Sequence, residues 1–364
     1  MWVYLLLVAV LFTLLVLSII YIVRFSHKAV KKYVENKYIA WILSFIPILL
    51  LVIGLLIDTM NAIVVDIHLI VIFALMKLLF FIVKKITKKE FSDYLILSIS
   101  IIICLLILIP AHYQAYNVHQ TKYLVKTTKD IGVDNFRIIQ ISDSHIGATM
   151  DGKKFSEYME EINNLNPDIV VITGDYVDDD TTYKDMADAS VGLGKLKTKY
   201  GVYFVLGNHD KGYYNARNFN YDDLKEELEK NNVIILEDDI VDLNNNIVLV
   251  GRQDKDSKDR ASIIDLTKNI DKNKYIITLD HQPNDYENEI KSGTDLVLSG
   301  HTHGGHIFPI GQFAILLGAN DKMYGKEKIK NTTFIVNSGI SGWAIKFRTG
   351  SIAEYAIIDI RKSN

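Results

Sequence analysis

The chain has 364 residues, enough for more than one domain, and a formal net charge of −3. Its basic residues outnumber its acids up to residue 110, whereas the remainder is acidic, which excludes nucleic acid as the default partner because binding to the phosphate backbone needs clustered lysine and arginine. The single cysteine, Cys104, excludes an intrachain disulfide and a thiolate metal cluster.

Long apolar stretches in residues 1–111 predict an all-α transmembrane region of about four helices. Each stretch is close to the roughly 20 residues that an α-helix needs to cross a bilayer. The predicted spans cover about residues 2–23, 38–57, 67–83 and 94–111. The first span lacks the basic n-region and the cleavage pattern of a signal peptide. One alternative is that the second and third spans form a re-entrant hairpin.

The charges in the loops predict the orientation of these spans. Two loops, the one before the second span and the one before the fourth, are rich in lysine, whereas the loop between them carries only Asp58 and Asp66. The positive-inside rule places the two basic loops in the cytoplasm. The protein is therefore expected to be a multi-pass cell-membrane protein with both termini, and its globular domain, outside the cytoplasm. Lys77 is expected to reach the interface from the third span.

Residues 112–134 are polar and predict a linker or a first strand, and residues 135–364 predict the globular domain. In that domain apolar runs alternate with helical patterns, which indicates an α/β fold with a mostly parallel sheet. The expected strands are 136–141, 168–173, 202–206, 233–236, 247–250, 275–279, 296–298, 333–336 and 353–360, and the expected helices are 154–165, 183–196 and 221–230. The close spacing of the later strands predicts a second sheet packed on the first. Residues 311–330 are expected to form an irregular loop that faces the substrate.

Five of these strands end in turns that are rich in Asp, His, Asn and Gly. The turns are Asp143-Ser-His145, Gly174-Asp175, Gly207-Asn-His-Asp210, Asp280-His-Gln282 and Gly300-His-Thr-His-Gly-Gly305. Any one of them alone is typical of an ordinary turn. In open α/β sheets, however, ligands collect outside the carboxyl ends of the strands. The joint arrangement therefore predicts one polynuclear metal site.

These motifs resemble the calcineurin-like metallophosphoesterase superfamily over about residues 135–360. The resemblance implies a double β-sandwich flanked by helices (α/β/β/α) and a metal-dependent phosphoric ester hydrolase. Several phrases are most similar to membrane-associated bacterial phosphoesterases of the UDP-2,3-diacylglucosamine pyrophosphatase type. The phrases span residues 140–147, 201–210, 300–305 and 337–342.

The resemblance also assigns roles to individual residues. Asp175 would bridge two divalent metal ions. The other ligands would be Asp143, His145 and His303 for the first ion, and Asn208, His281 and His301 for the second. Such oxygen and imidazole ligands suit Mn, Fe or Zn. Two ions about 3.5–4 Å apart would clamp a phosphate and hold the hydroxide that attacks phosphorus.

Other residues would act on the leaving group or the substrate. By resemblance His209 would protonate the leaving oxygen, with Asp210 orienting its ring. Asp178 would support the metal ligands. His306 and Arg217 are candidates for substrate contact, with a surface or loop role as the alternative.

The sequence thus predicts a membrane-anchored phosphoesterase that cleaves phosphodiester or pyrophosphate bonds. Lipid-linked or cell-envelope substrates are favoured because anchoring raises their effective concentration. One alternative is an anchored surface phosphomonoesterase or nucleotidase. Another is a membrane sensor or transporter regulated by the phosphoesterase domain, although the scarcity of intramembrane charge disfavours transport. The sequence leaves the identity of the metals and the oligomeric state open.

Overall fold

The computed structural model describes residues 13, 16, 19–213 and 216–363. The chain divides into two compact units, of which unit 1 ends at Leu108 and unit 2 begins at Ile109. Most of the first predicted span, residues 2–23, lies outside the described residues.

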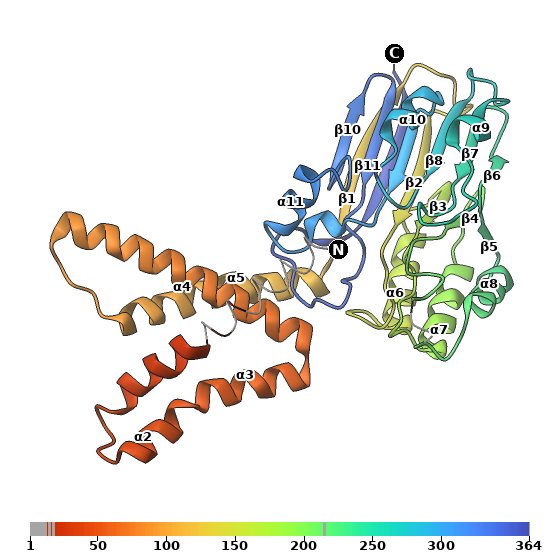
Figure 1. The fold of residues 1–364 in the computed structure, drawn as a ribbon. Coiled ribbons are helices and arrows are strands. Elements are labelled where there is room, and N and C mark those ends of the chain that lie inside the picture. Colours follow the sequence, from red (N-terminus) through yellow and green to blue (C-terminus); the bar gives the residue numbers. More distant parts are fainter. Residues whose placement is uncertain (1–12, 14–15, 17–18, 214–215, 364) are drawn as a thin grey trace. The chain divides into compact units, whose positions relative to one another are not determined.

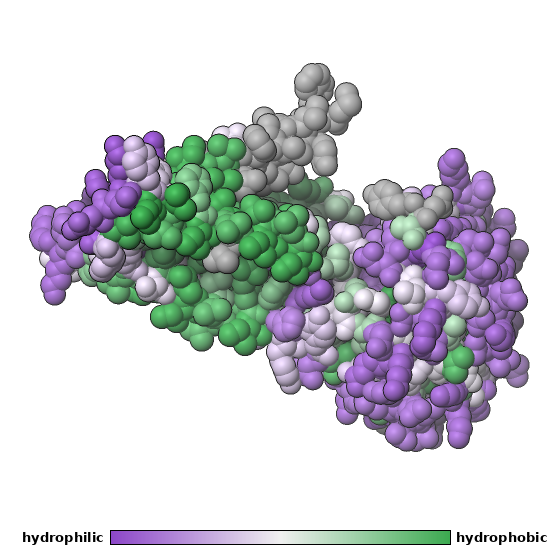
Figure 2. All heavy atoms as spheres, turned by 90° about the horizontal axis from the view of Figure 1, so that it is seen from below, coloured by the Kyte–Doolittle hydropathy of each residue, from purple (hydrophilic) through white to green (hydrophobic). Residues whose placement is uncertain are grey.

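Unit 1 is helical and strongly apolar. Residues 19–30 are helical, and the elements that follow are α2 (Lys37–Ser44), α3 (Ile46–Ile57), α4 (Thr59–Thr87) and α5 (Asp93–Tyr116). Three helical stretches in the described residues are long and apolar enough to cross a membrane, namely Lys37–Ile57, Thr59–Thr87 and Asp93–Tyr116. Hydrophobic side chains, green in Figure 2, cover much of the visible surface of these helices.

The second predicted span is interrupted in the structure. α2 and α3 meet at Phe45, and Pro47 lies at the start of α3. Proline has no N–H to donate to the preceding turn, which accounts for the break between the two helices. Farther along, Lys77 of α4 forms an ion pair with Asp93 at the start of α5, with Nζ and Oδ1 2.6 Å apart.

Unit 2 contains two six-stranded sheets (Figure 1). In order across the first sheet, the strands are β1 (Val118–Thr127), β12 (Ala353–Lys362), β2 (Asn135–Ile141), β3 (Ile169–Thr173), β4 (Val202–Val205) and β5 (Val233–Ile235). In order across the second sheet, they are β10 (Gly325–Ile329), β11 (Thr332–Val336), β9 (Leu296–Ser299), β8 (Tyr275–Leu279), β7 (Ile247–Gly251) and β6 (Asp239–Asp242). Strands β2 to β5 are parallel, as are β7 to β9, so their carboxyl ends share one edge of each sheet.

The two sheets pack face to face and helices cover their outer faces. The core between the sheets contains Phe136 and Ile138 of the first sheet and Leu249 and Leu298 of the second, all fully buried. The helices that pack on the first sheet are α6 (Gly152–Asn163), α7 (Tyr183–Gly194) and α8 (Tyr221–Lys230), and those on the second are α9 (Ile263–Thr267) and α10 (Tyr286–Lys291). This arrangement confirms the predicted α/β/β/α double sandwich.

Residues 112–134, expected to be a linker or a first strand, contain the strand β1. α5 continues to Tyr116, and β1 pairs in parallel with β12 over its ten residues, so most of this segment belongs to the first sheet. Only Val125 of β1 is buried. A strand with so little apolar alternation gives a weak sequence signal, and its register depends on its partner.

The prediction of an irregular loop at residues 311–330 is wrong. This segment contains most of α11 (Ile310–Leu316) and all of β10. Both elements are short and none of their residues is buried, so neither shows the apolar period by which a buried strand or helix is recognised.

The core between the sheets predicts a large effect of one substitution. Leu249→Ala removes a fully buried side chain on β7 and should lower the free energy of unfolding of unit 2 by about 2–5 kcal/mol. Ile240 on the neighbouring strand β6 is 44% exposed, so Ile240→Ala is the matched control and should cost less than about 1 kcal/mol. Urea unfolding followed by Trp343 fluorescence, with Trp2 and Trp41 replaced by Phe, measures both. Equal effects would contradict the assigned core.

Candidate metal centre

The five polar turns meet where the carboxyl ends of the two sheets come together. Asp143 and His145 follow β2, Asp175 follows β3, Asn208 and His209 follow β4, His281 follows β8, and His301 and His303 follow β9. Just beneath these turns, Gln140 Nε2 of β2 donates to Ser299 O of β9 at 2.8 Å. This bond ties the two sheets together under the site.

The backbone at these turns adopts conformations that L-residues rarely take. Positive φ angles occur at Asp143, His145, Asp175, His301 and His303, between 35° and 69°. Such conformations are concentrated at functional sites. Glycine is required beside them, because a Cβ on Gly207 would lie 2.2 Å from Asp175 Oδ1.

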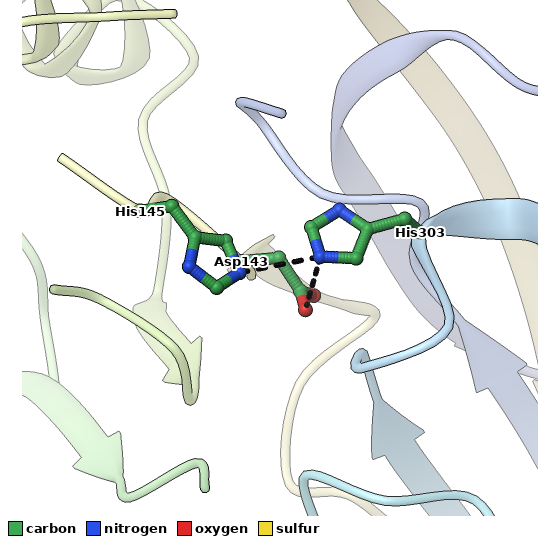
Figure 3. A group of neighbouring side chains, drawn as sticks. All are labelled: Asp143, His145 and His303. Carbon is green, nitrogen blue, oxygen red and sulfur yellow. Dashed lines mark hydrogen bonds and ion pairs between the residues drawn. The ribbon is translucent and has the colours of Figure 1, made fainter. Parts of the chain in front are cut away.

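The first group of candidate ligands is Asp143, His145 and His303, whose side chains point toward one another in Figure 3. His145 Nε2 lies 3.2 Å from His303 Nε2, which in turn lies 3.6 Å from Asp143 Oδ1. All three residues are buried. Burial lowers the pKa of His303 well below its ordinary value, which favours the neutral form of the ring that binds metals.

The second group surrounds His281. Its Nδ1 lies 2.7 Å from the carbonyl oxygen of Thr173, which can only accept, so Nδ1 carries a proton. The opposite atom, Nε2, lies 3.1 Å from both Asn208 Oδ1 and Asp175 Oδ2. His301 Nδ1 lies 3.0 Å from the same Asn208 oxygen. Burial lowers the pKa of His301 to about 4, which favours a neutral ring.

Asp175 lies between the two groups. Its Oδ2 is 3.6 Å from His145 Nε2 and 3.1 Å from His281 Nε2, while its Oδ1 accepts from His209 N at 2.9 Å. One carboxylate thus contacts a ring of each group. This is the position that a bridging ligand would occupy.

The residues fit two bound cations. Asp143 and Asp175 are 0% and 1% exposed, and their ion-pair partners among the described residues are histidine rings. Buried carboxylates are costly unless paired with positive charge or a metal. Carboxylate, imidazole and amide oxygen ligands suit Mn, Fe or Zn. The structure brings together all seven predicted ligands, and their roles as ligands stay a prediction.

A different carboxylate from the expected one contacts the His209 ring. His209 Nδ1 lies 3.1 Å from Asp178 Oδ1, and Asp178 Oδ2 lies 3.2 Å from His145 Nδ1. Asp210 instead accepts four backbone N–H groups, from Asp175, Tyr176, Val177 and Gly207, at 2.7–3.2 Å. Asp210 therefore holds two of the site's turns together, and Asp178 orients the ring.

Two weaker candidates make contacts of their own within the loops. Arg217 Nη2 donates to the carbonyl oxygen of Asp210 at 3.0 Å, and its guanidinium lies over the Phe219 ring. His306 Nε2 lies 3.2 Å from the carbonyl oxygen of Ile345. These bonds support loops around the site, and contact of either residue with substrate stays a prediction.

Trp343 lies beside the site and was not singled out from the sequence. Its ring centroid is 5.8 Å from that of His209, and its side chain is 36% exposed. The one signal in the sequence is its position directly after the phrase at residues 337–342.

The chain matches known phosphoesterases over the region that carries the site. The family model described as "Calcineurin-like phosphoesterase" matches residues 136–305. A protein of Aquifex aeolicus described as "Uncharacterized metallophosphoesterase" is 31% identical over 256 residues, which cover 69% of this chain and 95% of that protein. The bovine "Transmembrane protein with metallophosphoesterase domain" is 33% identical over 242 residues, which cover 61% of this chain and 52% of the bovine protein.

The geometry predicts the metal content of the purified full-length protein. Wild type should hold about two divalent ions per chain, and His301→Ala should reduce this to about one because it removes a ligand of the second group only. His306→Gln should keep both ions, since His306 lies outside the two groups. Elemental analysis after dialysis measures the ratio. Unchanged content in His301→Ala would contradict the second group.

Proposed function

This chain belongs to the calcineurin-like phosphoesterase family, and from that premise we propose that it is a membrane-anchored phosphoesterase with a dinuclear metal centre. The proposed reaction is hydrolysis of phosphodiester or pyrophosphate bonds in lipid-linked or cell-envelope substrates. The observation that supports it best is the shared position of Asp175 between the two ligand groups. A carboxylate common to both groups is what a pair of closely spaced ions requires.

Two bound divalent ions would supply Lewis acidity, which lowers the pKa of water and neutralises charge on the phosphoryl oxygens. The chain's own part is to hold these ions. Asp143 and Asp175 provide buried negative charge, and the low pKa values of His301 and His303 keep both rings available as ligands. The surrounding turns keep bulk water from these side chains, most of which are buried.

His209 is the proposed proton donor to the leaving oxygen. Burial disfavours its charged form, but the hydrogen bond to Asp178 and the charge of Asp175 raise the pKa of His209 above its ordinary value. The bond to Asp178 is made by Nδ1. Nε2 is then the atom from which His209 would transfer a proton.

The proposed placement of unit 2 outside the cytoplasm rests on the distribution of charge in unit 1. The loop after α4 carries Lys84, Lys85, Lys88 and Lys89, whereas the junction of α3 and α4 carries Asp58. Lysine-rich loops stay in the cytoplasm. Membrane phosphoesters on the outer face would then be the substrates within reach.

Metal-dependent cleavage of a diester tests the proposed function. The full-length protein, stripped by a chelator and reloaded with Mn, Fe, Zn or Mg, should cleave bis(p-nitrophenyl) phosphate faster than p-nitrophenyl phosphate. Asp175→Asn should lower kcat/KM by more than about 100-fold, because it disturbs both ligand groups. Preference for the monoester would indicate a surface phosphatase. Full activity of Asp175→Asn would exclude the dinuclear mechanism.

Proton donation by His209 predicts an effect that depends on the leaving group. His209→Ala should lower kcat by about 10²–10⁴ for an alkyl phosphodiester, whose leaving alkoxide needs a proton. The loss should be much smaller for a nitrophenyl ester, because nitrophenolate leaves without protonation. Equal losses for both esters would mean that His209 acts on binding or metal content instead.

The contact with Asp178 predicts the pH dependence of the alkyl ester reaction. Only protonated His209 donates, so activity is lost as pH rises through its pKa. Asp178→Asn removes the carboxylate that raises this pKa, so the alkaline limb of kcat/KM should move to lower pH. The neighbouring exposed Asp180 gives the control, Asp180→Asn, which should leave the limb in place. A shift to higher pH in Asp178→Asn would contradict the assignment.

A further inference from the structure

α11 and its flanking residues expose a continuous run of apolar side chains on unit 2. The helix has one polar side chain, Gln312, and none of its residues is buried. The exposed fractions are 60% for Phe308, 64% for Ile310, 57% for Phe313, 79% for Leu316 and 83% for Leu317. Together these five side chains form the apolar face of unit 2. A cluster of this kind on a folded domain marks an interaction site.

The apolar face is fixed to the loop that carries two predicted metal ligands, His301 and His303. A Cβ on Gly311 of α11 would lie 2.4 Å from the Cα of Gly305, so the helix begins in direct contact with this loop. Thr302 Oγ1 of the same loop donates to the carbonyl oxygen of Met323, beyond α11. Whatever binds the apolar face therefore lies next to the candidate metal centre.

The apolar face and the end of a candidate membrane span share a loop, residues 343–350. On one side of this loop, Arg348 N donates to Ala111 O of α5 at 2.9 Å, and His112 Nδ1 lies 3.0 Å from Lys346 O. On the other side, Thr349 Oγ1 accepts from Phe308 N at 2.9 Å. These contacts all lie within unit 2, which contains the last turns of α5. They connect the apolar face with the point at which the chain leaves the span.

We propose that the apolar face docks on the surface of the bilayer that α5 crosses. Helices that lie in the interfacial plane of a bilayer place their apolar side chains among the headgroups and upper acyl chains. Trp343, on the shared loop and next to His209, is of the residue type enriched at that depth. The loop with His301 and His303 is thereby held at the headgroup level, where an amphiphilic phosphoester keeps its apolar tail in the bilayer and presents its phosphate to the centre. The substrate part of this inference rests on the proposed function, whereas the docking does not.

Fluorescence quenching of a site-specific label tests the docking. The experiment uses the full-length protein in vesicles of phosphatidylcholine and phosphatidylglycerol. Cys104→Ala removes the single native cysteine, and Leu316→Cys carries an environment-sensitive nitrobenzoxadiazole label. Ile240→Cys, on β6 at the opposite edge of the second sheet from β10, carries the control label. Doxyl-labelled lipids should quench the Leu316 label at least about twofold, and aqueous iodide should quench mainly the Ile240 label.

Two results would overturn the docking. Equal quenching of both labels by iodide would leave the apolar face in water. A Leu316 label protected from iodide but untouched by doxyl lipids would mean that a protein, such as a second copy of the chain, covers it.

A paired activity assay separates docking from the substrate. Leu316→Ser combined with Leu317→Ser should slow cleavage of a phosphoester embedded in the vesicle about tenfold and leave a soluble diester unaffected, because the two residues lie outside the ligand groups. Equal rates of the variant and wild type on the embedded ester would refute the role in substrate selection. If the Leu316 label is quenched by lipid but wild type cleaves only the soluble diester and not the embedded ester, the docking is supported and the proposed lipid substrate is refuted.

Discussion

The structure of the site depends on two buried carboxylates whose ion pairs among the described residues are with histidine rings alone. Asp143 and Asp175 lie at the carboxyl ends of adjacent parallel strands. The nitrogen atoms of the histidine rings around them face their carboxylate oxygens. Negative charge at so low an exposure is stable only with compensating positive charge. Divalent cations satisfy this requirement with the ligand types present. The positive-φ turns and the close glycine contacts then follow as the backbone geometry that brings these oxygens and nitrogens together.

Two further buried charges hold the turns in place without belonging to the ligand groups. The carboxylate of Asp210 accepts hydrogen bonds from four backbone N–H groups in the turns after β3 and β4. The guanidinium of Arg348 donates to the carbonyl oxygens of Ser338 and Ile352 at 2.6 and 2.7 Å. Burial lowers the pKa of Arg348 to about 10, so it stays charged at neutral pH. Both residues exchange hydration for hydrogen bonds to the backbone, which stabilise the turns and loops beside the ligands.

The sequence predicted the parts of the molecule whose signals are local. The buried parallel strands are continuous apolar runs, and Tyr275–Leu279 coincides with β8. Because Asp, His and Asn follow the ends of these strands, the sequence predicted that the candidate ligands lie together at the carboxyl edge of the sheets. The partner of His209 could not be found in this way. Asp210 is its neighbour in sequence, but Asp178 reaches the ring from a different turn, and only the tertiary fold fixes that distance. For a related reason β1 was left open between a linker and a strand, and α11 was missed. β1 takes its register from a strand more than two hundred residues away, and α11 buries no side chain.

Anomalous X-ray scattering from a crystal of the Mn-loaded full-length protein tests the dinuclear centre most directly. Two anomalous peaks should appear about 3.5–4 Å apart. Both should lie within bonding distance of the Asp175 carboxylate. Asp143, His145 and His303 should surround one peak, and Asn208, His281 and His301 the other. A single peak, or two peaks that do not share Asp175, would contradict a bridged two-metal centre.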